Sequence, residues 1–222
     1  MRTPRADLAL YGVVRALVVA FCRWWWRLEV HGREHIPTEG AFVLAPVHRS
    51  NADTLVVSAL TRRRLRYMGK HTLWKHRLPA TFLTALGGFP VKRGAADREA
   101  LRKCSEVLAA GEPLVIFPEG TRQTGPEVHE LQEGAAYLAA RAGVPIVPVG
   151  IGGSEEAIVK GSKRLRRVKV TVLAGPPLVP PALEGRVPRS AVSRLSEELK
   201  GRLTELFDEA QAASRSGRQL RG

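Results

Sequence analysis

The sequence predicts a single α/β domain with a largely parallel central sheet flanked by helices, preceded by an amphipathic N-terminal helix at a membrane interface. From residue 41 onward, short apolar runs alternate with longer mixed segments, which is typical of strands alternating with helices. The 222 residues are enough for one such domain with a substantial core. Residues 8–26 are apolar but interrupted by arginines, which favours a helix lying in an interface.

The N-terminal helix is expected at the surface of a membrane rather than across it. At about 100° per residue, four arginines fall within roughly one third of its circumference: Arg5, Arg15, Arg23 and Arg27. A spanning helix needs about 20 apolar residues with few or no charges. We therefore expect these arginines at the lipid head groups and Trp24–Trp26 at the water boundary. A helix packed on the domain is the open alternative; a signal peptide is disfavoured because no small-residue cleavage site precedes the folded pattern.

The elements of the domain follow in chain order. Buried apolar runs predict strands at 41–46, 65–68, 89–92, 114–117, 146–151 and 168–173. Helices are predicted at 51–60, 97–110, 128–142 and 192–206. Gly111 and Gly143 mark the ends of two of them, because glycine readily adopts the left-handed conformation of a helix C-terminus. The expected organisation is an interfacial helix over 1–29, the domain over 30–208, and a polar, disordered tail over 209–222.

The charge of the chain points to anionic partners. The net charge is +14, which suits nucleic acid, a membrane surface or phosphorylated substrates. Two basic clusters, at 62–66 and 160–167, are either solvated faces or contacts with anionic lipid head groups. Neither cluster contains an aromatic platform or a recognition motif, so no nucleic-acid partner is expected.

No metal site is expected. The two cysteines, Cys22 and Cys104, have no metal-binding or redox spacing, which is typical of a reducing compartment. Residues 31–35 match the H-x-x-E-H pattern of zinc peptidases, but that pattern requires a helix. Gly32 and Pro37 disfavour a helix there.

His48 and Asp53 are the candidate catalytic pair. On one helix, side chains five residues apart point about 140° away from each other, so the two can meet only if His48 lies in the turn before the helix. A carboxylate on one imidazole nitrogen fixes the tautomer and leaves the other nitrogen free to take a proton. That arrangement can activate an alcohol. Ser50–Asp53 also matches a capping box, so a structural role for Asp53 stays open beside the catalytic one.

Four segments together resemble a known family. They are HRSNAD at 48–53, GFPVKRG at 88–94, FPEGTRQTG at 117–125 and VPIVPVGI at 144–151. In this order they are similar to the motifs of glycerolipid acyltransferases of the 1-acylglycerol-3-phosphate acyltransferase family, and the likeness covers about residues 30–175. The FPEGTR segment is highly specific, whereas H-x4-D alone is weak.

The resemblance implies a role for individual residues. His48 matches the general base of the family, and Asp53 matches the carboxylate that orients it. Acceptor binding is implied for Lys92, Arg93, Glu119, Gly120, Thr121 and Arg122. Arginine offers a planar fork to phosphate oxygens, and glycine lets the backbone approach a ligand.

Two departures from the family pattern concern the surroundings of this site. Val47 stands where many members have asparagine, and residues 131–134 read Leu-Gln-Glu-Gly where many have a basic Phe-Lys-x-Gly stretch. The second departure bears on which acceptor is bound and not on the base.

The resemblance implies direct acyl transfer, with acyl-CoA or acyl-carrier protein as co-substrate and no cofactor. The leading acceptor is the free hydroxyl of 1-acyl-sn-glycerol 3-phosphate, which gives phosphatidate in phospholipid biosynthesis. The alternatives are glycerol 3-phosphate or another lysophospholipid as acceptor, or a non-catalytic basic membrane-binding protein of the same fold. The expected partners are the acyl donor, the lysophospholipid and a lipid membrane surface. The expected location is the cytoplasmic face of a membrane, peripheral or monotopic.

Overall fold

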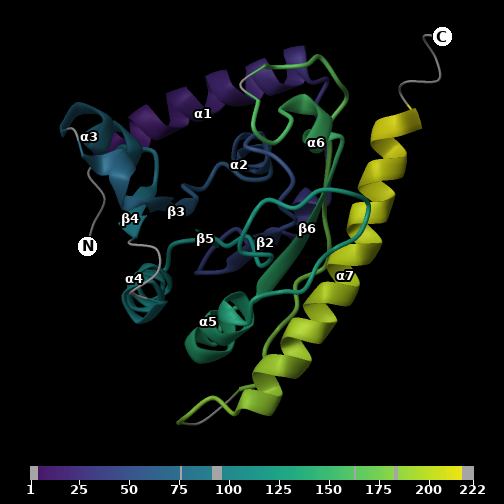
Figure 1. Cartoon of the computed structure of the whole chain (residues 1–222). Coiled ribbons are helices and arrows are strands. Elements are labelled where there is room, and N and C mark those ends of the chain that lie inside the picture. The colour runs from purple at the N-terminus through teal and green to yellow at the C-terminus, as the bar shows by residue number, and fades with distance from the viewer. Residues whose placement is uncertain (1–4, 76, 92–96, 163, 183–184, 217–222) are drawn as a thin grey trace.

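The computed structural model describes residues 5–75, 77–91, 97–162, 164–182 and 185–216. Within these ranges the chain forms one seven-stranded sheet with helices on both faces, as Figure 1 shows. The strands are β1 (Glu29–His31), β2 (Val43–Pro46), β3 (Arg66–Lys70), β4 (Gly88–Val91), β5 (Leu114–Val115), β6 (Ile146–Gly152) and β7 (Thr171–Ala174). The α-helices are α1 (Arg5–Trp25), α2 (Asp53–Val56), α3 (Arg77–Ala85), α4 (Asp97–Ala109), α5 (Gly134–Ala142), α6 (Ser154–Ala157) and α7 (Arg189–Ser216). Single 3-10 turns are η1 (Arg33–His35), η2 (Val57–Ala59) and η3 (His71–Trp74).

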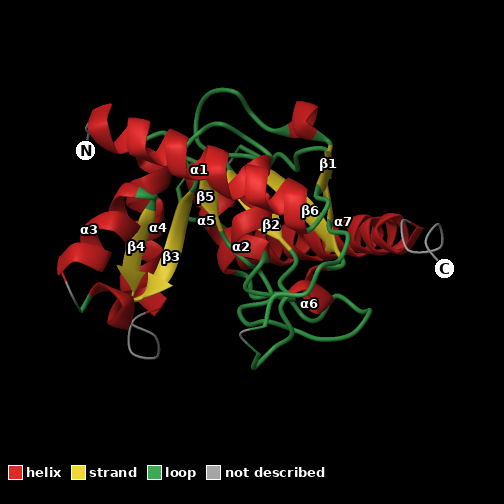
Figure 2. Ribbon diagram, turned by 90° about the horizontal axis from the view of Figure 1, so that it is seen from above, coloured by secondary structure: helices red, strands yellow, loops and turns green. Residues whose placement is uncertain are grey.

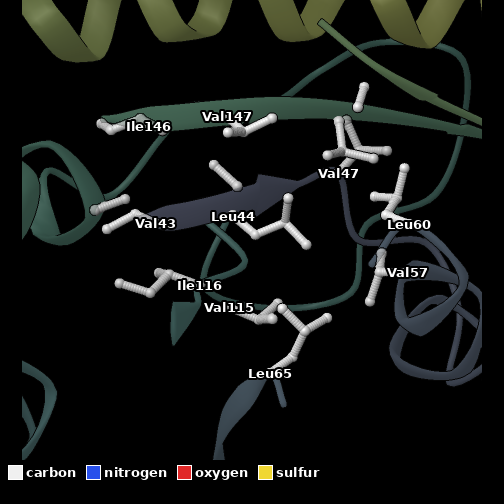
Figure 3. Close-up of a cluster of buried hydrophobic side chains, with 14 of the residues drawn as sticks. Val43, Leu44, Val47, Val57, Leu60, Leu65, Val115, Ile116, Ile146 and Val147 are labelled. Atoms are coloured by element: carbon white, nitrogen blue, oxygen red, sulfur yellow. The ribbon is translucent and has the colours of Figure 1, made fainter. Parts of the chain in front are cut away.

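The predicted α/β domain with a largely parallel central sheet is confirmed. The strand order is β1-β7-β6-β2-β5-β3-β4, and every neighbouring pair is parallel except β6 with β7. Strand β2 lies in the middle, and all four of its residues are buried. A central parallel strand is covered on both faces, which is why its sequence is a continuous apolar run. Figure 3 shows Val43 and Leu44 of β2 beside Ile146 and Val147 of β6, with Val115 on the other side.

Helix α7 covers β6 closely because that strand carries two glycines. A Cβ added at Gly150 would lie 2.2 Å from the carbonyl oxygen of Leu206, and one at Gly152 would lie 2.0 Å from that of Ala210. The contact continues beyond residue 208, and Ala210 is fully buried. The prediction of a disordered tail from residue 209 was therefore wrong as far as Ser216, where α7 ends. Residues 217–222 of that tail lie outside the described ranges.

Helix α1 turns Tyr11, Arg15 and Cys22 toward the domain. Tyr11 and Cys22 are buried, and Arg15 Nε donates a hydrogen bond to the carbonyl oxygen of Ser58 at 2.8 Å. Burial lowers the pKa of the Arg15 guanidinium. The prediction that Arg15 points to lipid head groups was wrong, because this residue lies on the face that packs against η2.

The outer side of α1 is apolar instead. Eight exposed residues lie within about 60° of the direction of Val13 at 100° per residue, and we call them the apolar stripe: Ala6, Ala9, Leu10, Val13, Ala16, Leu17, Ala20 and Trp24. The tryptophan run is divided between surface and core, since Trp24 is 64% exposed and Trp26 is completely buried. Among the helices of the described ranges, none has the length and hydrophobicity needed to cross a bilayer.

Several boundaries differ from prediction for tertiary reasons. Helix α5 begins at Gly134 rather than at 128, because the N–H groups of His129 and Gln132 bond to the turn after β5 instead of forming a helix. The short strand β1 and helix α3 were not predicted. Strand β1 is three residues long and is held by its pairing with β7, a contact distant in sequence.

Candidate active site

His48 and Asp53 meet as expected. His48 follows the C-terminal end of β2 by two residues, and Asp53 is the first residue of α2. The Nδ1 atom of His48 lies 3.0 Å from Asp53 Oδ2. The Asp53 side chain is fully buried, while the His48 side chain is 17% exposed. Among the described residues no protein group binds His48 Nε2, so this nitrogen is available to a substrate hydroxyl.

Asp53 also holds the turn that carries the histidine. Its Oδ2 accepts the backbone N–H of Arg49 at 2.6 Å and that of Ser50 at 2.7 Å. The bond to Ser50 N–H is one half of the predicted capping box. The other half is absent from the described bonds of Ser50, whose hydroxyl donates to the carbonyl oxygen of Ile158 at 2.9 Å. The structural and the orienting role of Asp53 are therefore compatible, and one carboxylate serves both.

Glu119 is buried behind the His48–Asp53 pair and is not exposed to a substrate. Its Oε2 accepts the backbone N–H of His48 at 2.9 Å, and its Oε1 accepts that of His129 at 3.2 Å. The guanidinium of Arg49 contacts both oxygens at 2.8 Å. The Glu119 side chain is fully buried. This position suits a residue that supports the histidine, whereas the resemblance implied contact with the acceptor.

Arg49 completes this buried network. It is 1% exposed, and it donates to the carbonyl oxygens of Glu127 at 2.7 Å and His48 at 3.1 Å. Its guanidinium carbon lies 4.6 Å from the ring centre of Phe207 on α7. Sequence reasoning missed this residue because arginine is almost always exposed, and only its place next to His48 hinted at a role.

The first residue of the FPEGTR segment packs on the imidazole. The rings of Phe117 and His48 are 4.0 Å apart between centroids and inclined by 24°, which is a stacked arrangement. The N–H of Gln123 donates to the carbonyl oxygen of His48 at 2.8 Å. The segment after β5 therefore holds His48 in two ways: Phe117 stacks on its imidazole ring, and Gln123 bonds to its backbone carbonyl.

Three of the candidate acceptor residues lie at the surface of the same turn. Gly120 and Thr121 are exposed and Arg122 is half-buried. Gly120 has a φ of 71°, in the region where glycine is favoured, and a Cβ there would lie 3.2 Å from Gln132 Cγ. The other two candidates, Lys92 and Arg93, lie outside the described residues.

The two departures from the family pattern have structural explanations. Val47 is fully buried among the core side chains, as Figure 3 shows, and its N–H bonds to the carbonyl oxygen of Val149 at 3.0 Å. Glu133 accepts a hydrogen bond from the hydroxyl of Ser193 on α7 at 2.9 Å. The carboxylate of Glu133 is therefore engaged with α7.

An apolar cavity of about 380 Å³ opens beside the start of α2. It lies between α1, α2 and β3, and its lining includes Val14, Val18, Leu55, Tyr67, Met68 and Leu83. Thr54 and Leu55, which line it, directly follow Asp53. A long apolar chain in this cavity would have its head close to the His48–Asp53 pair.

Neither cysteine offers a nucleophile near neutral pH. Both are buried, and burial raises the pKa of the Cys22 thiol to about 11 and that of the Cys104 thiol to about 12. The H-x-x-E-H segment is also unsuited to its zinc pattern, because it forms the end of β1 and the single turn η1, with Gly32 in the left-handed conformation.

Comparisons with known proteins give one consistent result. A family model described as Acyltransferase matches residues 27–152. The 1-acyl-sn-glycerol-3-phosphate acyltransferase of Bacillus subtilis is 26% identical over 180 residues, covering 81% of this chain and 87% of that protein. A protein of the same name from Chlamydomonas reinhardtii is 27% identical over 196 residues, and the match spans 84% of this chain but only 58% of the relative. The crystal structure of the 1-acyl-sn-glycerophosphate acyltransferase of Thermotoga maritima is similar with a TM-score of 0.70 and 25% identity, covering 88% of this chain and 80% of that one.

Proposed function

This chain belongs to the acyltransferase family, and we propose that it transfers a fatty acyl group from acyl-CoA or acyl-carrier protein to the free hydroxyl of 1-acyl-sn-glycerol 3-phosphate. The chain is an enzyme that acylates an alcohol in phospholipid synthesis. The observation that carries the proposed mechanism is the 3.0 Å contact between His48 Nδ1 and the buried carboxylate of Asp53.

His48 acts as the general base in this proposal. Its Nδ1–H donates to Asp53, so Nε2 accepts the proton of the acceptor hydroxyl as the oxygen attacks the thioester carbonyl. The tetrahedral intermediate then collapses, the carbon–sulfur bond breaks, and the imidazolium returns its proton to the leaving thiolate. The products are the new ester and the free thiol, and no covalent acyl-enzyme forms.

The acceptor phosphate binds at the turn that carries Thr121 and Arg122. Both side chains lie at the surface of the turn that bonds to the backbone of His48 through Gln123. Lys92 and Arg93 are proposed to complete this basic site.

An acyl chain occupies the apolar cavity between α1 and β3. Its walls are mainly aliphatic and aromatic, which suits hydrocarbon, and they include Thr54 and Leu55, which follow Asp53 in the sequence. Because Val14 and Val18 of α1 form part of its wall, the cavity and the apolar stripe lie on opposite sides of the same helix.

The membrane contact is made by the apolar stripe of α1. An outward row of Leu10, Val13, Leu17 and Trp24 would be costly in water and is suited to burial in the interfacial region of a bilayer. Association is therefore peripheral or monotopic. We propose the cytoplasmic face of the membrane as the location.

The decisive experiment is an acyl-transfer assay over a panel of acceptors. Purified enzyme is incubated with palmitoyl-CoA or palmitoyl-acyl-carrier protein, and both free thiol and lipid product are measured. We expect phosphatidate from 1-acyl-sn-glycerol 3-phosphate, and much less product from glycerol 3-phosphate or from a lysophospholipid without a phosphomonoester. Thiol release that does not depend on any acceptor, or no transfer at all, would contradict the proposal.

A further inference from the structure

A strongly basic loop follows α6, and we define it by its described residues, 158–162 and 164–167. The loop is closed on itself, since the N–H of Arg166 donates to the carbonyl oxygen of Ala157 at 2.9 Å. Its exposed side chains include Lys160, Arg164, Arg166 and Arg167. Leu165 is 44% exposed between two of these arginines. Exposed cations around an apolar side chain are suited to binding a surface that is both anionic and partly apolar.

The charges of this basic loop are available to an outside partner. Neighbouring Lys169 forms an ion pair with Glu29 at 2.9 Å. The carboxylate of Glu155 accepts the backbone N–H of Gly125 at 3.3 Å. In contrast, Arg164 and Arg166 form no ion pair with the part of the chain that the structure describes. Two exposed guanidinium groups on one short loop, neither in an ion pair with a described residue, attract anions from solution.

The basic loop lies beside the C-terminal end of α1. Trp26 Nε1 donates to the carbonyl oxygen of Arg166 at 3.1 Å, and the guanidinium carbon of Arg167 lies 5.9 Å from the Trp25 ring. The next ring, that of the exposed Trp24, is 5.6 Å from Trp25. Figures 1 and 2 both show the chain after α6 next to this end of α1. The loop therefore adjoins the end of the apolar stripe.

The same loop touches both halves of the candidate active site. Its first residue, Ile158, accepts the hydroxyl hydrogen bond of Ser50, which is two residues from His48. The ammonium group of Lys160 donates to the carbonyl oxygen of Arg122 at 3.0 Å. A partner held by the loop is thus connected by direct contacts to the turn of the base and to the proposed phosphate site.

We propose that the basic loop binds the anionic head groups of the membrane on which α1 lies, with Leu165 in the interface, and so anchors the active site at anionic lipid. The proposal rests on the proposed membrane contact of the apolar stripe. Anionic lipid is favoured over nucleic acid because Leu165 and the neighbouring Trp24 are apolar groups suited to hydrocarbon rather than to a phosphate backbone.

The test is binding to phosphatidylcholine vesicles with and without phosphatidylglycerol. The wild type is compared with the double variant Arg164→Gln/Arg166→Gln, which leaves Lys160 and the active-site contacts in place. The matched control is Arg141→Gln/Arg194→Gln, which removes the same charge from exposed positions on α5 and α7. Unchanged thermal unfolding establishes that each variant is folded.

We expect the loop variant to lose about 25-fold in partitioning to anionic vesicles, at about fivefold per arginine. Its binding to pure phosphatidylcholine vesicles should hardly change, and the control should retain most of the wild-type preference. Equal losses in both variants would show a general charge effect and overturn the proposal. If the wild type binds both vesicles equally, the stripe contact stands and the loop proposal fails; if it binds neither, both fail. A loss of affinity for a single-stranded oligonucleotide but not for vesicles would also overturn it.

Discussion

Arg49 and Glu119 form a buried ion pair in which the guanidinium contacts both carboxylate oxygens at 2.8 Å. The pair joins the turn after β2 to the turn after β5, and the same carboxylate accepts the backbone N–H of His48. The position of the proposed base is therefore set by two turns that are about 70 residues apart in the sequence. Two of the four motifs that resemble the acyltransferase family are in this way physically one unit.

Glu119→Gln tests whether Glu119 supports the position of His48 or binds the acceptor. The substitution leaves the charge of Arg49 buried without a counter-charge, so we expect a loss of about 3–5 kcal/mol in the free energy of unfolding. In urea denaturation the control Glu106→Gln should cost less than about 1 kcal/mol, because its partner Arg102 is exposed. Under conditions where the variant is folded, kcat should fall more than the acceptor KM rises. A raised acceptor KM with unchanged stability and kcat would place Glu119 at the acceptor instead.

Arg122→Ala should weaken binding of the acceptor. Removal of a guanidinium that contacts phosphate should raise the acceptor KM about tenfold or more, since charge-assisted hydrogen bonds contribute about 1.5–3 kcal/mol. The KM for the acyl donor should change little. Steady-state kinetics with each substrate varied in turn provide the measurement, and Arg102→Ala on the exposed side of α4 serves as the control. Equal changes in both constants would indicate structural damage.

The cysteines should be dispensable and unreactive in the folded enzyme. Because burial raises the thiol pKa to about 11 for Cys22 and about 12 for Cys104, both are protonated at pH 8, and thiolate accumulates only as the pH rises through those values. Iodoacetamide should therefore modify them slowly at pH 8 and completely after denaturation. Cys22→Ser and Cys104→Ser should keep activity. A stoichiometric burst of free CoA that disappears in either variant would contradict direct transfer.

Charges placed in the apolar stripe should release the enzyme from membranes. Val13→Glu/Leu17→Glu puts two carboxylates on the outer side of α1, so binding to phosphatidylcholine vesicles should fall by about tenfold or more. The control is Val179→Glu, at a residue that is 77% exposed and follows Leu178, the bridge partner of Ile146 at the start of β6. Cosedimentation with vesicles measures the effect. Unchanged vesicle binding of the double variant would show that the apolar stripe does not contact the membrane.

The sequence was informative where local pattern and burial agree. The continuous apolar run before His48 predicted β2, and the five-residue spacing to Asp53 predicted that the pair could meet only across a turn, as it does. The parallel sheet followed from the alternation of strand and helix patterns. Each of these features depends on residues close together in the chain.

The features that could not be predicted depend on distant contacts. The arginines of α1 share a sector in sequence, but the bond of Arg15 to Ser58 shows that part of this sector faces the protein. Charge periodicity alone does not tell a head-group contact from a buried hydrogen bond. Likewise Glu119 belongs to a motif that implies substrate contact, and only the fold shows that Arg49 and two backbone N–H groups occupy its oxygens.

His48→Ala tests the central claim most directly. Initial rates of phosphatidate formation from palmitoyl-CoA and 1-acyl-sn-glycerol 3-phosphate are measured for the wild type and the variant, with thermal unfolding as the check of the fold. A general base contributes about 10²- to 10⁴-fold, so we expect the rate to fall at least 100-fold while the fold is retained. A folded variant that keeps more than about a tenth of the wild-type rate would contradict the assignment of His48 as the base.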